Sequence, residues 1–256
     1  MTNTGPIVIK IGGSTLGSED TTMDDVVALQ RSGQQVIVVH GGGAIITDWL
    51  TRLAVPSEFV DGLRSTSAGA LEVVVAVLRG VINTQLVAEI GERGGRAVGL
   101  CGVDGGIVRA ERYDARLGMV GRITGVDGDF IRAICETGAI PVIAPIGLEP
   151  PAQPLNINAD TVAGEVARAV QASRLVFLTD VDGLLDAGQQ LIPRLNPERA
   201  GALRNDGTIG GGMIPKVEAC LRAAETGALA HMANGTTAGT LRRLIEGAPL
   251  GTLVEA

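Results

Sequence analysis

The chain has 256 residues, a formal net charge of −7 and 45% hydrophobic residues. This length and apolar content allow a full buried core and exclude a disordered chain, while the acidic balance excludes the basic surface that a nucleic-acid backbone requires. The N-terminus lacks a charged and apolar leader, and no apolar run approaches the ~20 residues of a membrane span. We therefore expect a cytoplasmic, soluble protein with neither nucleic acid nor a membrane as a partner.

The core is expected to consist of Val, Ile, Leu and Ala, because aromatic residues make up only 2% of the chain. Cys101, Cys135 and Cys220 have no paired spacing, and we expect them to be small buried residues in a reducing compartment. Short β-branched runs recur at residues 7–11, 36–39, 97–100, 141–144, 175–178 and 228–232. With helical stretches between them, these runs predict an α/β fold with a mainly parallel sheet and helices on both faces.

Helical periodicity is clearest over residues 70–78, 81–90, 130–136, 163–170 and 217–225. The sequence predicts helix starts at Asp24 and Asp127 and helix stops at Gly94, Gly138 and Gly227. Glycines break up the stretch 107–125, which predicts small antiparallel hairpins. We expect one continuous domain with a soft boundary near residue 173, between an N-terminal lobe (1–173) and a C-terminal lobe (174–256).

Lysine occurs only twice, at Lys10 and Lys216, against nineteen arginines, and each lysine lies beside a glycine-rich segment. A bias in base composition could leave two lysines by accident, but their unusual neighbours favour a role. A compact ammonium group can reach a crowded phosphate where a planar guanidinium lacks room. The pattern therefore indicates phosphoryl chemistry, with both lysines expected to be exposed in a cleft.

Glycines follow the first two predicted strands, as Gly12 and Gly13 after Lys10 and as Gly41, Gly42 and Gly43 after His40. The ends of neighbouring parallel strands meet at the edge of the sheet where ligands bind. Backbone N–H groups of such loops, together with a following helix N-terminus, attract anions. The spacing matches neither a Walker P-loop nor a dinucleotide fingerprint.

Two further segments carry polar residues before predicted helices. Arg64, within residues 61–66, could clamp a carboxylate or form a surface ion pair, and the spacing leaves both open. Asn156, Asn158 and Asp160 alternate, so they share a face if the segment is extended. Asp160 is then either a helix cap or an acid that holds the two lysines in register, with an asparagine binding substrate.

The last candidate segments lie in the C-terminal part. One comprises Asp180, Val181, Asp182, Gly183, Leu184 and Leu185, and the other contains Ile209 and Gly210 and leads to Lys216. Acidic and glycine residues at a strand end suit the base and ribose of a nucleotide. Asp180 and Asp182 could also bind magnesium, but we favour ribose or adenine contact because phosphates and water can hold the ion.

The chain lacks an obvious acid, base or nucleophile set, since neither of its two histidines has a recognisable triad partner. Phosphoryl transfer depends mainly on positioning and on electrostatic stabilisation. A carboxylate acceptor is already ionised at neutral pH and needs no general base. Two lysines can bring the anions together and stabilise the transferring group.

Over residues 7–253 these motifs together resemble the amino-acid kinase superfamily, and most closely its acetylglutamate kinases. The resemblance implies an open αβα sandwich of two lobes, the N-terminal lobe binding the acyl amino acid and dimerising and the C-terminal lobe binding the nucleotide. It also implies ATP-dependent phosphorylation of N-acetyl-L-glutamate to an acyl phosphate in arginine biosynthesis. Mg²⁺ would be held mainly by phosphates and water, with no metal site made by the protein alone.

The resemblance also implies a role for each candidate residue. Lys10 and Lys216 would stabilise the transition state, and Asp160 would organise them. The phosphoryl group or substrate would be bound by Gly13, Gly42 and Gly43, and the acyl amino acid by Arg64 and Asn156. ATP would be bound by the segment from Asp180 to Leu185 and by the residues around Ile209 and Gly210.

The chain departs from this family at Thr84, where relatives usually carry lysine, and at Asn234, Gly235 and Thr236. Arginine-inhibited relatives have an additional N-terminal helix that links dimers into a hexamer, and nine residues precede Lys10 here. We therefore expect a homodimer without arginine feedback. Two alternatives stay open: a kinase for acylated or carrier-linked 2-aminoadipate, and a non-catalytic nucleotide-binding sensor.

Overall fold

The computed structural model describes residues 4–12, 21–60 and 62–256. Its central sheet is formed by β1 (Ile7–Ile11), β2 (Val36–His40), β5 (Ala97–Cys101), β8 (Ile140–Ala144), β11 (Arg174–Thr179), β12 (Arg194–Leu195), β13 (Leu229–Asn234) and β14 (Thr252–Val254). The strand order is β12-β14-β13-β11-β1-β2-β8-β5, and the six strands from β13 to β5 are parallel. β14 runs antiparallel to β13. The predicted mainly parallel sheet is confirmed, each predicted strand lying within two residues of its observed bounds.

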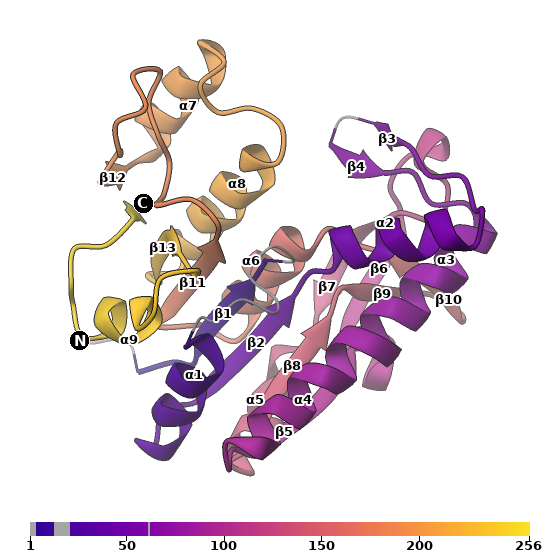
Figure 1. Ribbon diagram of the computed structural model, residues 1–256, viewed down its shortest axis with the longest axis horizontal. Helices are drawn as coiled ribbons and strands as arrows, with labels where there is room; N and C mark the ends of the chain where they lie inside the picture. The colour runs from indigo at the N-terminus through magenta and orange to yellow at the C-terminus, as the bar shows by residue number, and fades with distance from the viewer. Residues whose placement is uncertain (1–3, 13–20, 61) are drawn as a thin grey trace.

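Helices cover both faces of this sheet (Figure 1). One face carries α1 (Thr22–Arg31), α2 (Gly43–Arg52), α3 (Ala68–Val75), η1 (Ala76–Ile82), α4 (Asn83–Glu92) and α9 (Thr240–Ile245). The other carries α5 (Gly128–Glu136), α6 (Ala159–Ala169), α7 (Pro197–Asn205) and α8 (Met213–Ala224). Because side chains alternate along a strand, Val8 joins the second core while Ile7 and Ile9 join the first. The result is the expected three-layer sandwich.

The helical stretches predicted at 70–78 and 81–90 are confirmed, and they belong to one helix, Ala68–Glu92, which is formed by α3, the π-helical η1 and α4. Gly80 does not end it, since an isolated glycine costs only about 1 kcal/mol in a helix. By length and composition alone this helix could cross a membrane, contrary to the sequence expectation. However, 44% of its most apolar window is buried in the protein, where Val74 and Leu78 join the sheet core.

A second sheet and a short hairpin project beside the main sheet. β6 (Val108–Arg112) and β7 (Gly121–Val126) form the antiparallel pair predicted within 107–125. β9 (Ile146–Glu149) and β10 (Gln153–Asn156) complete the sheet in the order β10-β9-β6-β7. The hairpin pairs β3 (Phe59–Val60) with β4 (Leu63–Arg64). Short 3-10 turns occur at η2 (Asp104–Gly106) and η3 (Ala115–Leu117).

The predicted helix ends are largely confirmed. The Asp127 side chain accepts a hydrogen bond from the Phe130 N–H and so caps α5. Gly94, Gly138 and Gly227 follow helix ends with positive φ, which a glycine adopts without strain. The predicted start at Asp24 is two residues late, because α1 begins at Thr22. Cys101, Cys135 and Cys220 are buried free thiols, as expected.

Candidate active site

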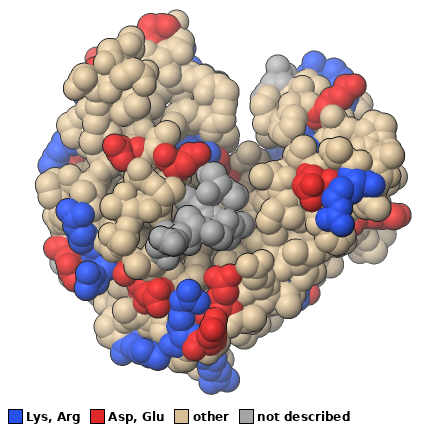
Figure 2. Space-filling view, viewed as in Figure 1, with Lys and Arg blue, Asp and Glu red and all other residues tan. Residues whose placement is uncertain are grey.

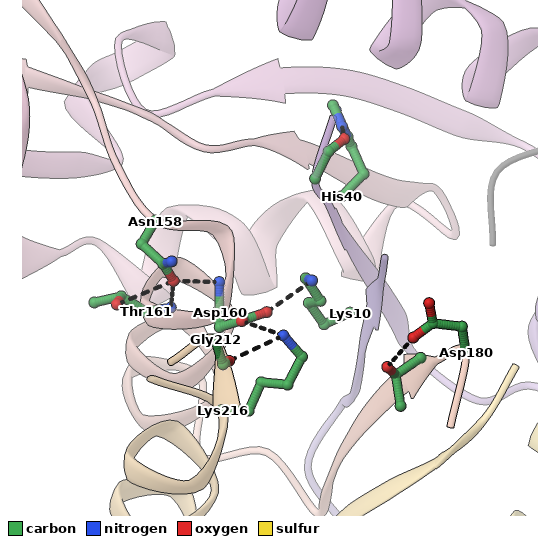
Figure 3. A network of polar contacts seen from close by, with 10 residues as sticks. Lys10, His40, Asn158, Asp160, Thr161, Asp180, Gly212 and Lys216 are labelled. Atoms are coloured by element: carbon green, nitrogen blue, oxygen red, sulfur yellow. Dashed lines mark hydrogen bonds and ion pairs between the residues drawn. The ribbon is translucent and has the colours of Figure 1, made fainter. Parts of the chain in front are cut away.

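The two lysines meet at one carboxylate. Lys10 Nζ lies 2.7 Å from Asp160 Oδ1, and Lys216 Nζ lies 2.8 Å from Asp160 Oδ2 (Figure 3). The three residues come from β1, α6 and α8, which are far apart in sequence. With both ammonium groups protonated, the cluster carries one net positive charge beside the sheet edge. The structure thus brings Lys10, Asp160 and Lys216 together.

Local sequence explains why Asp160 is available to the lysines. Asn158 caps α6, because its Oδ1 accepts hydrogen bonds from the N–H groups of Asp160 and Thr161. The alternative in which Asp160 is the cap is therefore wrong. A Cβ on Gly164 would lie 2.9 Å from the Ala219 backbone, so the glycine lets α6 and α8 pack closely. This close packing places Lys216 within reach of Asp160.

Burial and charge act against each other in this cluster. Burial, reinforced by the charge on Lys216, lowers the pKa of Lys10, although Asp160 opposes the shift. Burial alone would raise the pKa of Asp160, but the two lysines together hold it below its ordinary value. The carboxylate is therefore ionised at neutral pH. The expectation that Lys10 is exposed in a cleft is wrong: only 6% of the residue is exposed, because it belongs to a strand covered on both faces.

A cavity of about 220 Å³ opens beside this cluster. The candidate residues that line it are Lys10, Gly42, Gly43, Arg64, Asn156 and Asp160. Leu78 and Ile157 supply part of its apolar wall. Gly13, predicted to bind the phosphoryl group, lies outside the described residues. One cavity therefore collects the candidate residues of four separate segments.

The glycine loop presents backbone donors to this cavity. Gly42 is the N-cap of α2, which has neither a side-chain cap nor an acidic residue in its first turn. The N–H groups at such a helix start lack intrahelical partners and favour an anion. A Cβ on Gly42 would lie 2.4 Å from Ile82 and 2.9 Å from Leu78, so only glycine allows this approach.

Arg64 is held rigidly beside the loop. Its guanidinium donates to Ser57 Oγ at 2.6 Å, to Thr47 Oγ1 at 2.7 Å and to the Gly43 carbonyl at 3.1 Å. It also stacks 4.6 Å from the ring centre of Phe59. The alternative of a surface ion pair is wrong, since Arg64 is only 8% exposed and pairs with no acid among the described residues. Among the described residues, three of the five guanidinium N–H groups have a partner.

Asn156 ends β10 and donates from Nδ2 to Thr66 Oγ1 at 3.0 Å, which leaves its carbonyl for another partner. Sequence reasoning missed the residues that orient these groups: Thr47, Ser57, Phe59 and Thr66. Phe59 alone carried a signal, as one of only three phenylalanines in the chain. The others are small polar residues whose role depends on the fold.

The C-terminal segments do not line this cavity. Asp180, Asp182 and Gly210 are exposed, whereas the side chains of Leu184 and Ile209 are buried in the core. Among the other residues of the first segment, Gly183 is buried and Val181 and Leu185 are partly exposed. Asp182 Oδ1 accepts a hydrogen bond from Asn234 Nδ2 at 2.9 Å. Of these residues, Asp180 lies close enough to the cluster for its charge to oppose the lowering of the Lys10 pKa by burial (Figure 3).

A second, larger cavity separates two parts of the molecule. It has a volume of about 750 Å³ and is lined by Gly62 and Leu63 of the hairpin and by Pro215 and Glu218 of α8. Figure 2 shows the surface deeply notched between the side carrying α7 and α8 and the side carrying β3 and β4. The lysine cluster therefore lies where two halves of the molecule face each other.

The fold and the lysine cluster define a phosphotransferase of the amino acid kinase type, and comparison with known proteins agrees. The model of the amino acid kinase family matches residues 5–234, so the chain belongs to that family. Within it, the chain belongs with the acetylglutamate kinases. It is 47% identical to the acetylglutamate kinase of Rhodopseudomonas palustris (strain ATCC BAA-98 / CGA009), over 86% of this chain and 80% of the relative.

Other relatives and solved structures agree. The acetylglutamate kinase of Acidiphilium cryptum is 44% identical over 98% of this chain and 90% of its own length. The crystal structure of smu.665 from Streptococcus mutans UA159 covers 100% of both chains at a TM-score of 0.88 and 27% identity. An isopentenyl phosphate kinase, at 19% identity and a TM-score of 0.67 over 97% of this chain and 99% of its own, shares the fold alone.

Proposed function

We propose that the protein transfers the terminal phosphoryl group of ATP to the side-chain carboxylate of N-acetyl-L-glutamate, forming N-acetyl-L-glutamate 5-phosphate in arginine biosynthesis. The observation that carries this proposal is the placement of Asp160 between two lysines beside a cavity. The acceptor follows from the acetylglutamate kinases that are 41–47% identical to this chain. A carboxylate acceptor also fits a site that offers no general base.

The lysines and the glycine loop would stabilise the transferring phosphoryl group. Lys10 and Lys216 neutralise charge that spreads over its oxygens, while Asp160 fixes the position of both ammonium groups. Gly42 and Gly43 contribute N–H groups at the start of α2, and Gly13 is proposed to act in the same way. The acceptor carboxylate is already ionised and needs no general base. The main role of the site is therefore to hold the carboxylate in line with the terminal phosphate of ATP.

Arg64 and Asn156 would bind the acyl amino acid. The positive charge of Arg64 suits a carboxylate, and the partners at Ser57 and Thr47 hold the guanidinium in place. Asn156 offers its side-chain carbonyl to the amide N–H of the acylated amino group. The cavity volume of about 220 Å³ suits an acceptor of this size.

The segments Asp180–Leu185 and Ile209–Gly210 would bind ATP. Because the Leu184 and Ile209 side chains are buried, these two residues would contact the nucleotide through their backbone. The described residues contain no group of three His, Cys, Asp or Glu side chains that could hold a metal ion. A Mg²⁺ ion would be carried by the phosphates and water, and it would neutralise charge on the phosphates.

We propose that the enzyme is a cytoplasmic homodimer with the lobe boundary near residue 173. The long helix exposes the small residues Ala76, Gly80, Thr84 and Ala88 beside β5, the edge strand of the main sheet. Nothing lies within 4 Å of a Cβ built on Gly80, so Gly80→Glu is compatible with the folded subunit and blocks close approach of a second copy. Light scattering should give twice 26.2 kDa for the wild type and a smaller mass for the variant.

The activity is tested with ATP, Mg²⁺ and three separate acceptors: N-acetyl-L-glutamate, N-acetyl-L-aspartate and N-acetyl-L-aminoadipate. Hydroxylamine traps any acyl phosphate as a hydroxamate. We expect hydroxamate with N-acetyl-L-glutamate in clear preference. A preference for the aminoadipate compound would replace the acceptor, and ATP binding without hydroxamate from any acceptor would sink the proposal.

A further inference from the structure

His40 is a fully buried histidine that the proposed mechanism does not use. It is the last residue of β2 and directly precedes the glycine loop. Its Nδ1 lies 3.0 Å from the Gly41 carbonyl oxygen, and its Nε2 lies 3.1 Å from Asn83 Nδ2. Asn83 is also fully buried and is the first residue of α4. Both ring nitrogens of His40 therefore have a defined partner.

The neighbours of Asn83 determine where the imidazole proton lies. Asn83 Nδ2 is 2.8 Å from the Val142 carbonyl, which only accepts, and Arg79 Nη1 is 3.1 Å from Asn83 Oδ1 and only donates. These two contacts independently fix the orientation of the amide. Asn83 Nδ2 must then donate to His40 Nε2, so the ring proton lies on Nδ1 and is donated to the Gly41 carbonyl.

The ring is neutral at neutral pH. Burial, together with the charges of Lys10 and Arg79, lowers the pKa of His40 from an ordinary value of 6.5 to about 4, while the bond to Gly41 opposes the shift. A neutral imidazole carries one donor and one acceptor, which matches the two contacts. The contacts on both sides therefore agree on a single tautomer.

This tautomer has a consequence for the phosphoryl site. In a trans peptide the carbonyl oxygen and the following N–H point in opposite directions. Because the Gly41 carbonyl is tied to His40, the Gly42 N–H points away from that ring. Gly42 lines the acceptor cavity, and Figure 3 shows His40 set apart from the lysine cluster. The hydrogen bond thus fixes the direction of the Gly42 N–H, in a residue that lines the cavity.

We propose that His40 is a positioning residue: Asn83 holds its ring in the tautomer that donates to the Gly41 carbonyl, and this bond aims the Gly42 N–H at the transferring phosphoryl group. The inference rests on the proposed function, because it assigns a role in that reaction. The packing supports it, since the side chains of Ile82 and Leu78 contact Gly42 so closely that a Cβ there would lie 2.4 Å and 2.9 Å from them.

The tautomer is measured directly by ¹⁵N NMR of the histidine rings in the wild-type protein. The chain has only two histidines, so His231→Gln assigns both signals. We expect Nδ1 protonated and Nε2 bare in His40 at neutral pH. In Asn83→Leu, which has a similar shape without the donor, we expect a mixture of tautomers. A wild-type ring protonated on Nε2 would overturn the inference.

The functional consequence is measured with two amide variants of His40. The nitrogen of the asparagine in His40→Asn occupies the position of Nδ1 and keeps a donor to Gly41, whereas the amide in His40→Gln reaches the position of Nε2. We expect His40→Gln to have a kcat about tenfold below that of His40→Asn, with KM values within about twofold, since a misaligned donor weakens transition-state binding. Urea unfolding of both variants controls for stability.

Equal kcat values in the two variants, or losses that follow stability alone, would overturn the inference. If the wild type forms no acyl phosphate, the proposed function fails separately. The inference is then judged by the amide signal of Gly42 on addition of ATP and Mg²⁺. A shift in His40→Asn that is absent from His40→Gln supports it, and the same response in both overturns it.

Discussion

The proposed acceptor side of the site and its proposed nucleotide side are built in opposite ways. On the acceptor side, Arg64 and Asp160 are buried and held by several protein partners. On the nucleotide side, Asp180, Asp182 and Gly210 are exposed. A small acceptor offers few contacts, so its groups must be preorganised, whereas a nucleotide brings a large surface of its own. The side chains that are held in position before any ligand binds therefore lie mainly on the acceptor side.

The comparison is tested most severely by Asp160→Asn. The change leaves a buried ammonium group, that of Lys10, and a partly buried one, that of Lys216, without the carboxylate that pairs with them and positions them. We expect turnover to fall by about 10³-fold and stability by about 3–5 kcal/mol. The hydroxamate assay and urea unfolding measure the two effects. Glu165→Gln, on the same helix but outside the acceptor cavity, is the matched control; retained turnover in Asp160→Asn would show that the carboxylate is dispensable.

The two lysines should respond alike in turnover but differently in stability. We expect Lys10→Arg and Lys216→Arg each to lower turnover by about 10²-fold, because a guanidinium cannot reproduce the position of the ammonium group. The side chain of Lys10 is 8% exposed and that of Lys216 is 19% exposed. Lys10→Arg should therefore also destabilise the fold, whereas the sequence expectation that both lysines are exposed in a cleft implies little loss of stability at either.

Assays of turnover and thermal unfolding separate the two effects. Arg243→Lys, on the exposed surface of α9, controls for exchange of the two cations. Near-normal turnover in either lysine variant would mean that the lysine is an accident of composition. Equal stability of the two variants would contradict the prediction that the more deeply buried lysine, Lys10, is the more sensitive to substitution.

Arg64→Lys tests the acceptor side alone. A lysine ammonium has three N–H donors, so it cannot maintain the three protein contacts of Arg64 and still donate to a carboxylate of the substrate. We expect KM for N-acetyl-L-glutamate to rise by about 10–100-fold while KM for ATP stays within about twofold. Arg52→Lys, on the exposed end of α2, is the control. An equal rise in both KM values would show that Arg64 does not act on the acceptor side alone.

Sequence reasoning succeeded where a feature depends on local chemistry. Strand runs, the Asp127 cap and the isolated lysines are all visible in short windows, and the structure contains each of them. It failed where the outcome depends on packing. The tertiary packing decides which faces of a strand or helix are covered, and a short stretch of sequence does not contain that information. The burial of Lys10, the cap at Asn158 and the burial of Leu184 are examples. The contact between His40 and Asn83 joins residues 43 positions apart, so it also required the fold.

The smallest predicted effect is a loss of unfolding free energy at acidic pH. It involves the two buried histidines, His40 at the end of β2 and His231 on β13. Burial lowers the pKa of His40 on the acceptor side to about 4, and burial together with the charge of Arg174 does the same for His231 on β13. Between an ordinary pKa of 6.5 and about 4, the unfolded state binds more protons than the folded state. Stability from these neutral rings is therefore complete above the ordinary pKa and is lost as pH falls toward about 4.

We expect each histidine to cost about 2 kcal/mol of unfolding free energy between about pH 7.5 and about pH 5. Urea unfolding across this range measures the slope, and His231→Gln should remove about half of it because its amide stays neutral. An unchanged slope in that variant would assign the acid sensitivity to His40 and hence to the acceptor side. Asp160 contributes little over this range, since the lysines hold its pKa below its ordinary value and keep it ionised.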